Sequence, residues 1–194
     1  MTASAPAIRT HFVRLALKRL RAIPDGKGAV IRSRIEDALP QIREADPAGW
    51  LALDLALTVC NTIVDVLGEE AARQFWTQLI FDSYDRGILK PLISQAREAP
   101  RTGGGPIALL KLAPMAWQLA ARDCGTIELI DDKDGGLSLS SASLAPEIAR
   151  SRGFHCIFYG ACQAMLDQFR APGTVEVRRE PGMVDRLIYD IRVR

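Results

Sequence analysis

The sequence predicts an α+β fold in which a helical N-terminal part packs on a small antiparallel sheet. Up to about residue 122, apolar residues recur every three or four positions, which is typical of helices with one buried face. After residue 125 they alternate with polar residues in two pairs of short runs, which is typical of β-hairpins. A helical segment separates the two pairs, so the predicted order is helices, hairpin, helix, hairpin.

The composition is that of an ordinary globular chain. Its 194 residues are 48% hydrophobic, and 25 basic residues against 23 acidic ones give a net charge of +2. That length suits one domain or one domain with an appendage. Because the overall basic excess of a nucleic-acid-binding protein is missing, we expect no nucleic-acid partner.

The chain shows no signal for a membrane or for export. It has no run of about 18 apolar residues, and residues 1–7 lack the apolar core of a secretory signal. We therefore expect a cytoplasmic protein without a membrane span. The cysteines form no CxxC pair, so we expect reduced thiols at all four positions. They are Cys60, Cys124, Cys156 and Cys162.

The N-terminal residues predict a basic amphipathic helix over 11–22, which Pro24-Asp25-Gly26 ends. We expect residues 1–27 to form this helix and a linker, and residues 28–194 to form a single α+β domain. The basic face could contact an anionic partner, although a solvated helix face is the commoner role for such residues.

Two longer helices are predicted next. The first covers residues 29–45, with Pro40 kinking or dividing it. Asp46-Pro47 then combines an N-cap acid with a proline in the first turn, which predicts a helix over 46–67. Its wide apolar stripe makes it the expected central buried helix. The stripe comprises Trp50, Leu53, Leu57, Cys60, Val64 and Leu67, and it is widened by Leu51, Leu55, Ala56, Val59 and Ile63.

Further helices follow Gly68. They are expected over residues 69–84, 88–99 and 107–122, the last with a kink at Pro114. Residues 101–106 contain three consecutive glycines and predict a flexible connection.

The C-terminal third predicts the sheet. Residues 126–129 and 137–140 form the first hairpin, and residues 174–179 and 185–193 form the second. A helix over 146–169 lies between them. In the last strand, alternate apolar residues face one side, so the sheet should have one buried face and one wet face. They are Leu187, Tyr189, Ile191 and Val193.

Few residues could carry metal or haem chemistry. His155 lies close in sequence to Cys156 and Cys162, as a metal or haem ligand set would require. However, successive helical residues diverge by about 100°, and two turns place His155 roughly 10 Å from Cys162. We therefore favour a structural or surface role for His155 and for His11, and we predict no metal site.

No catalytic motif emerges. The chain lacks GxSxG, and the glycines at 103–105 lack the remainder of a phosphate-binding loop. The aspartates at 131, 132 and 134 lack the glutamate that closes a calcium loop, so a hairpin turn is the better interpretation. We therefore expect no enzyme. Several aromatic residues could line a cavity, although core packing is commoner. They are Trp50, Trp76, Trp117, Phe75, Phe154, Phe158 and Tyr159.

Two regions resemble a family of bacterial proteins of unknown function that has many paralogues in myxobacteria. One runs from Gly49-Trp50 to Leu67-Gly68, and the other joins Ala113-Pro114-Met115-Ala116-Trp117 to residues 124–129. That family is related to a wider fold group of haem-based nitric-oxide sensors, 4-vinyl-reductase-like domains and small Golgi-tethering subunits. The resemblance implies a helical layer on a twisted four-stranded antiparallel sheet, with room for a small molecule or acyl chain between them.

The resemblance does not bring the chemistry of those relatives with it. The haem sensors use a histidine on the helix before the sheet and a later Tyr-x-Ser-x-Arg motif, but residues 107–123 contain no histidine and the motif is absent. The vinyl-reductase-like domains often end in a metal-binding cysteine pair, but residues 174–194 contain no cysteine. We therefore expect no cofactor.

We predict a non-enzymatic ligand-binding or protein-interaction module that is regulatory and forms a homodimer. Its small apolar ligand would lie between the sheet and the helices, where Gly160 and Ala161 leave space beside Phe158; a fully packed core is the competing arrangement. Two alternatives stay open: a sensor of haem or another tetrapyrrole through His155 or His11, and an enzyme of unrecognised mechanism. The candidate ligand-binding residues are Trp50, Trp117, His155, Phe158, Cys162 and Tyr189.

Overall fold

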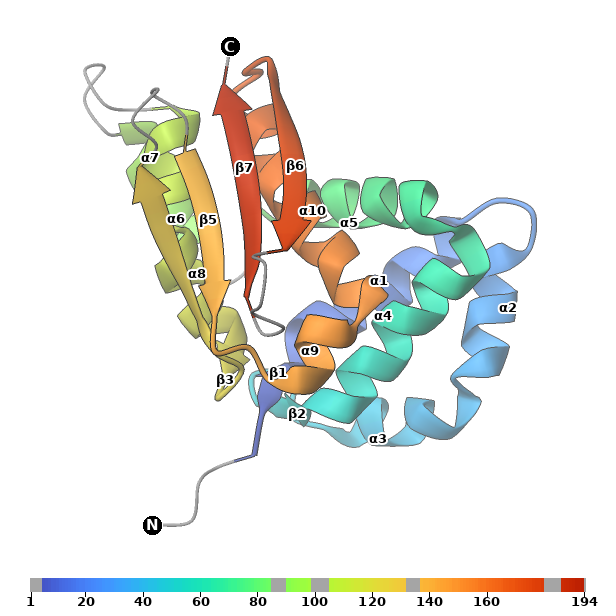
Figure 1. The fold of residues 1–194 in the computed structure, drawn as a ribbon. Coiled ribbons are helices and arrows are strands. Elements are labelled where there is room, and N and C mark those ends of the chain that lie inside the picture. The colour runs from blue at the N-terminus through green and yellow to red at the C-terminus, as the bar shows by residue number, and fades with distance from the viewer. Residues whose placement is uncertain (1–4, 85–89, 99–104, 132–136, 180–185, 194) are drawn as a thin grey trace.

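The computed structural model describes residues 5–84, 90–98, 105–131, 137–179 and 186–193. It shows a mixed α+β fold with two antiparallel sheets, as the sequence predicts. In Figure 1, four long strands stand side by side at one edge of the molecule, with α10 behind β6 and β7. Helices α1 to α5 gather on the other side. The expected linker over 101–104 and the centres of both hairpin turns lie outside the described residues.

The helices follow the predicted order. Three expected helices are divided: 29–45 before Pro40, 107–122 at Leu112, and 146–169 at Ser151. The α-helices are α1 (Thr10–Arg19), α2 (Lys27–Arg34), α3 (Leu39–Glu44), α4 (Leu53–Leu67), α5 (Glu69–Ser83), α6 (Lys90–Glu98), α7 (Pro106–Lys111), α8 (Ala113–Ala120), α9 (Pro146–Arg150) and α10 (Arg152–Gln168). Short 3-10 turns cover Leu20–Ala22 and Glu36–Ala38.

The four-stranded sheet has the order β4-β5-β7-β6 and is antiparallel throughout. Its central register aligns Leu139 with Leu129 on one side and with Tyr189 on the other. The strands are β4 (Thr126–Asp131), β5 (Leu137–Ala142), β6 (Gly173–Arg179) and β7 (Leu187–Val193). The two predicted hairpins are therefore confirmed, and their second strands pair in the middle of the sheet.

A second sheet was not predicted. Its strand β1 (Ala7–Arg9) lies between β2 (Trp50–Ala52) and β3 (Ala121–Arg122). The prediction that a helix begins at Asp46-Pro47 is wrong, because Asp46 instead accepts a 3.0 Å hydrogen bond from Ala48 N in a turn. Helix α4 begins only after β2.

Helix α4 is central, and its buried face is part of the predicted wide stripe. The buried residues are Leu53, Ala56, Val59, Cys60, Ile63 and Val64. Trp50 lies outside the helix, and Leu57 and Leu67 are only partly buried. Without the extra turns at its start, the expected N-terminal part of the stripe does not exist.

The basic N-terminal segment packs into the main core through Val13, Ala16 and Leu17. Its cations serve the fold: Arg14 donates to the carbonyl oxygens of Ile42, Arg43 and Ala45 at the end of α3, and Arg19 pairs with Asp82 on α5. Cations in such positions satisfy the carbonyl groups that a helix C-terminus leaves unpaired.

Helix α10 lies against α4 and α5 at two glycines. A Cβ at Gly153 would lie 2.4 Å from the carbonyl carbon of Cys60, and one at Gly160 would lie 2.7 Å from the backbone nitrogen of Thr77. These glycines therefore permit close contact between helices. The expectation that Gly160 leaves space for a ligand is wrong, because the α5 backbone fills that space; Ala161 does line a pocket.

The N-terminus of α10 is held by a partly buried polar side chain on α4. Asn61 Oδ1 accepts hydrogen bonds from Gly153 N at 3.0 Å and from Ser151 Oγ at 2.7 Å. Ser151 Oγ in turn accepts from Phe154 N at 3.1 Å and caps the helix. Asn61, which interrupts the apolar sequence of α4, thus fixes the position of α10.

The sheet has two unlike faces, but the second is less exposed than the predicted wet face, because Ser138, Ser140 and Ile188 on it are buried. The face that carries Leu139, Tyr189 and Ile191 packs on the helices. On the other face, Ser138 Oγ and Arg178 Nε each donate to Asp190 at 2.7 Å. Burial alone would raise the pKa of Asp190, but these hydrogen bonds outweigh burial and lower it.

None of the helices in the described part of the chain combines the length and apolar character needed to cross a bilayer.

Candidate functional site

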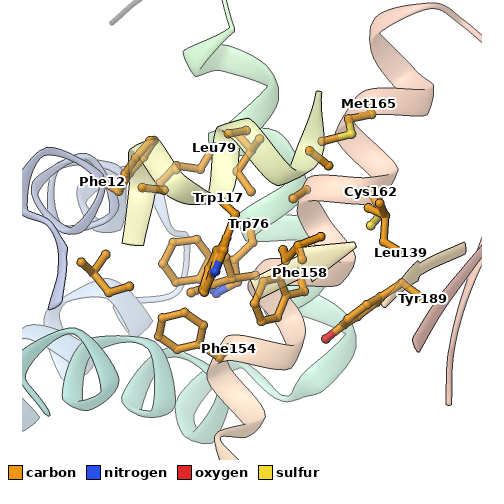
Figure 2. Close-up of a pocket in the computed structure, with 18 of the residues that line it drawn as sticks. Phe12, Trp76, Leu79, Trp117, Leu139, Phe154, Phe158, Cys162, Met165 and Tyr189 are labelled. Carbon is orange, nitrogen blue, oxygen red and sulfur yellow. The ribbon is translucent and has the colours of Figure 1, made fainter. Parts of the chain in front are cut away.

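An apolar pocket lies between the buried face of the four-stranded sheet and helices α1, α5, α8 and α10. It has a volume of about 180 Å³. Among the described residues that line it, none is a histidine, lysine, arginine, aspartate or glutamate. Figure 2 shows the lining side chains, from Phe12 on α1 to Met165 on α10. The interior is therefore not fully packed, and the space suits an uncharged molecule.

Aromatic rings form the middle of the pocket. The Phe158 ring centroid lies 5.0 Å from that of Trp117, 5.5 Å from that of Tyr189 and 5.9 Å from that of Phe154. These side chains come from α8, α10 and β7, so the cluster joins the sheet to the helices. The Trp117 indole is fixed in place because its Nε1 donates to Gly125 O at 2.9 Å.

Burial favours the neutral forms of three titratable groups that line the pocket. Burial raises the pKa of the Cys60 and Cys162 thiols to about 12. Burial also raises the pKa of Tyr84 above its ordinary value, and its hydroxyl donates weakly to Ala161 O at 3.5 Å. Neutral thiols are poor nucleophiles and poor metal ligands, so these groups favour binding over covalent chemistry.

A second tryptophan, Trp76, also lines the pocket, but its indole N–H differs from that of Trp117 in its hydrogen bonding. The side chain of Trp76 on α5 is 5% exposed, and its Nε1 is buried. No acceptor among the described residues lies within hydrogen-bonding distance of that nitrogen. In the view of Figure 2 the Trp76 indole lies in the centre of the lining side chains.

The structure brings together four of the six residues that the sequence suggested for ligand binding. Trp117, Phe158, Cys162 and Tyr189 line the apolar pocket. Whether they bind a ligand stays a prediction.

The other two lie elsewhere, so the expectation of one site with all six is wrong. Trp50 lies on β2, where the Arg9 guanidinium stacks 3.9 Å from its ring centroid and that of Arg122 lies 5.2 Å away. Because Trp50 belongs to a strand rather than to α4, it lies outside the lining.

His155 is on the far side of α10. Its Nε2 lies 3.0 Å from Ala149 O, and the ring borders a separate, polar pocket of about 220 Å³ with Glu69, Arg73 and Arg178. His11 is partly buried beside Phe12, with 5.9 Å between the ring centroids, and is not part of the apolar lining. In the described part of the chain, no three His, Cys, Asp or Glu side chains gather as a metal ion would require.

The sequence suggested some of the other lining residues and missed others. Trp76 and Phe154 were among the aromatic residues suggested for a cavity, and both line it. Cys60 and Tyr84 were not suggested, because their place in the pocket depends on how α4 and α5 meet α10. That information is tertiary and has no local pattern.

Comparisons with known proteins identify the fold. A scan against protein-family models and a search of the curated proteins gave no match. Among solved structures, the chain is similar to an H-NOX protein from K. algicida, with 9% identity, 96% of this chain and 97% of that chain covered, and a TM-score of 0.65. It is similar to an S. oneidensis H-NOX protein in the Fe(II)NO ligation state, with 11% identity, 96% and 99% covered, and a TM-score of 0.62. An oxygen-binding H-NOX domain related to soluble guanylate cyclases matches with 13% identity, 96% and 94% covered, and a TM-score of 0.58.

These comparisons confirm the haem-NO-binding fold that the sequence resemblance implied, across almost the whole chain. They give no support to the myxobacterial family in particular.

The lining residues do not fit a haem held as the sequence resemblance implies. The helices before the sheet, α7 and α8, carry no histidine and place Trp117 in the pocket, and an indole N–H is a donor without a lone pair for iron. Cys60 and Cys162 are present only as neutral thiols, and the described lining offers no cation for the carboxylates of haem. The pocket volume of about 180 Å³ is also small for haem. A cavity of about 150 Å³ accommodates benzene, and haem has roughly seven times as many non-hydrogen atoms as benzene.

Proposed function

We propose that this chain is a ligand-binding sensor domain whose apolar pocket takes a small uncharged molecule in place of haem. The observation that supports this most strongly is a pocket of about 180 Å³ with an uncharged described lining, in a fold otherwise built like the H-NOX domains. Its position also suits a sensor, because a ligand there would contact both the helices and the sheet.

The size and chemistry of the pocket support binding of an apolar molecule. An apolar cavity of about 150 Å³ in another protein stays dry and binds benzene. The pocket here is slightly larger and has a similar lining. A molecule of one or two fused rings would replace missing packing contacts and remove its own surface from water, which stabilises the complex by about 25 cal/mol per Å² of apolar surface buried.

The test is binding by the purified protein, measured by native mass spectrometry and by thermal stabilisation with naphthalene. We expect one naphthalene per chain and a concentration-dependent rise in Tm. Ala116→Leu, on the lining of α8, should reduce this rise because its side chain enters the pocket. Ala71→Leu, at an exposed position of α5, is the matched control and should bind like the wild type. No stabilisation of the wild type would refute the proposal.

A haem sensor is the second candidate, and the likeness to H-NOX structures favours it. Titration with haem distinguishes the two. A saturable Soret band at one haem per chain, lost in Ala116→Leu, would establish haem in this pocket. With the lining described above, we expect no saturable band, and a band retained in Ala116→Leu would indicate attachment elsewhere.

A homodimer and a regulatory role form part of the same proposal. Sedimentation equilibrium of the protein with and without naphthalene would measure the dimer and its dependence on ligand. A monomer under both conditions would contradict this part alone.

A further inference from the structure

Two tryptophans line the pocket, and their N–H groups differ. Trp117 Nε1 donates to Gly125 O at 2.9 Å. Trp76 Nε1 is shielded from solvent, yet no described residue offers it an acceptor. The side chain of Trp76 is 95% buried, since its exposed fraction is 5%. One pocket thus holds one satisfied indole donor and one that is unsatisfied.

A buried donor without an acceptor is unusual and needs an explanation. More than about 90% of buried polar groups in proteins are hydrogen-bonded, because leaving one unpaired forfeits its bond to water. Trp76 is not forced into this position by a lack of alternatives, since a phenylalanine would fill much of the same space with no polar atom. The indole therefore indicates an acceptor that none of the described residues supplies.

Water is a poor candidate for that acceptor. A buried water needs between two and four polar partners. Two polar groups of the described lining are already bonded within the chain: Ser141 Oγ donates to Leu187 O and accepts from Leu187 N, each at 3.1 Å, and Trp117 Nε1 donates to Gly125 O. An acceptor atom carried on an otherwise apolar molecule needs only one donor, so it suits this pocket better.

The remaining chemistry of the ligand follows from the lining. Because the described lining has no charged side chain, an ionised ligand would lose its hydration without a partner. The rings of Trp117, Phe154, Phe158 and Tyr189 meet at centroid distances of 5.0 to 5.9 Å. Such an arrangement favours a flat ring that can pack against them in stacked or edge-to-face geometry.

We propose that the pocket takes a neutral, planar aromatic molecule with a hydrogen-bond acceptor, and that this acceptor bonds the indole N–H of Trp76. The inference rests on the proposed function, which requires only that the pocket bind an uncharged molecule. It adds that Trp76 is the residue that selects among such molecules.

The experiment compares naphthalene with quinoline, which have the same shape and differ in one ring nitrogen. Affinities of both are measured by calorimetry at pH 8, where quinoline is neutral, for the wild type, Trp76→Phe and Trp117→Phe. Losing one hydrogen bond in a dry site should weaken quinoline by about tenfold relative to naphthalene in Trp76→Phe. Trp117→Phe is the matched control: it changes the same pocket but removes a donor already bonded to the protein, so both affinities should change by the same factor.

A second readout needs no variant to fold. The chain has three tryptophans, so three indole N–H resonances are expected in a ¹⁵N-labelled wild type. Quinoline should move the Trp76 resonance downfield as the hydrogen bond forms, and naphthalene should not.

The possible failures are distinguishable. If both molecules bind, Trp76→Phe leaves their affinity ratio unchanged and the Trp76 resonance responds alike to both, the inference is wrong while the proposed function stands. If neither binds the wild type, the proposed function and the inference fail together.

Discussion

Helix α10 provides the sharpest test of how this fold is packed. Replacing Gly160 by alanine adds one methyl group where α10 meets α5. That Cβ would lie 2.7 Å from Thr77 N, 2.8 Å from Trp76 Cβ and 2.9 Å from the Trp76 carbonyl carbon. Two of the three neighbours are backbone atoms, so no side-chain rotation can relieve the contact, and the helices must separate by roughly 1 Å to reach an ordinary carbon contact.

Two opposing effects decide the sign of the change in stability. Alanine is better than glycine in a helix interior by about 1 kcal/mol. Overpacking costs about 1–3 kcal/mol, and the rigid backbone neighbours place this site toward the upper end. We therefore expect Gly160→Ala to lower the free energy of unfolding by about 1–2 kcal/mol, which for a domain of this size corresponds to a Tm lower by roughly 2–8 °C. Gly153→Ala should cost more, since its Cβ would lie 2.4 Å from Cys60.

The measurement is urea unfolding followed by circular dichroism. Ala71→Gly, at an exposed position of α5, measures the helix-propensity effect separately and should cost about 1 kcal/mol. If Gly160→Ala were as stable as the wild type or more stable, propensity would have outweighed packing. The close approach of α5 and α10, and the position of Trp76 that depends on it, would then be wrong.

Three further outcomes are expected. Asn61→Ala should cost about 2 kcal/mol in urea unfolding, because it leaves donors at the start of α10 without an acceptor; a loss below about 0.5 kcal/mol would contradict this. Asp190→Asn should lower the free energy of unfolding by about 1 kcal/mol at pH 7. Because the pKa of Asp190 is lowered in the folded state, this contribution is complete above about pH 4 and disappears as the pH falls through the lowered value. The stabilities of the variant and the wild type should therefore converge in acid. Asp65→Asn, whose carboxylate is exposed 3.6 Å from an arginine, is the control and should change little at either pH. At pH 8 the native protein should resist alkylation at Cys60 and Cys162, whose thiols have pKa values of about 12, and intact mass should show labelling only after unfolding.

The parts of the fold that the sequence predicted correctly depend on local periodicity. Alternation over four residues or more was enough to identify β4 to β7, and the three- and four-residue repeat identified α5 almost to the residue. Strand β1 shows why the other sheet was missed. It has three residues, its partners lie about 45 and 115 positions away in the chain, and no periodic pattern can be detected in so short a segment.

The error at Asp46 has a physical cause of the same kind. An aspartate followed by proline is equally good at starting a helix and at forming a turn, because in both cases the carboxylate accepts a backbone N–H. What decided between them was the pairing of Trp50 with Arg9, which turns residues 50–52 into a strand. That pairing is tertiary, so the local signal could not choose.

The pocket could be located from the sequence only as far as the layers that enclose it. An apolar sheet face and an apolar helix face imply an interface between the two layers. The sequence resemblance added that this interface has room for a small molecule or acyl chain. Which side chains border the space depends on the rotation of each helix, which separates Phe158 from His155, and on strand β2, which takes Trp50 out of the lining. The state of Trp76 could not be predicted at all, because an unpaired donor is recognised only when every neighbour has been placed.

A fold like that of the H-NOX domains does not by itself fix the chemistry of the pocket inside it. Part of the packing is maintained by polar contacts of residues outside the described lining: the Asn61 cap of α10 and the hydrogen bonds around Asp190. The pocket lining is therefore free to change its chemistry while the architecture around it stays. One fold can therefore hold different residues in its pocket layer, here a tryptophan that donates to a neighbouring carbonyl, and the chemistry of the site rather than the fold decides which ligand fits.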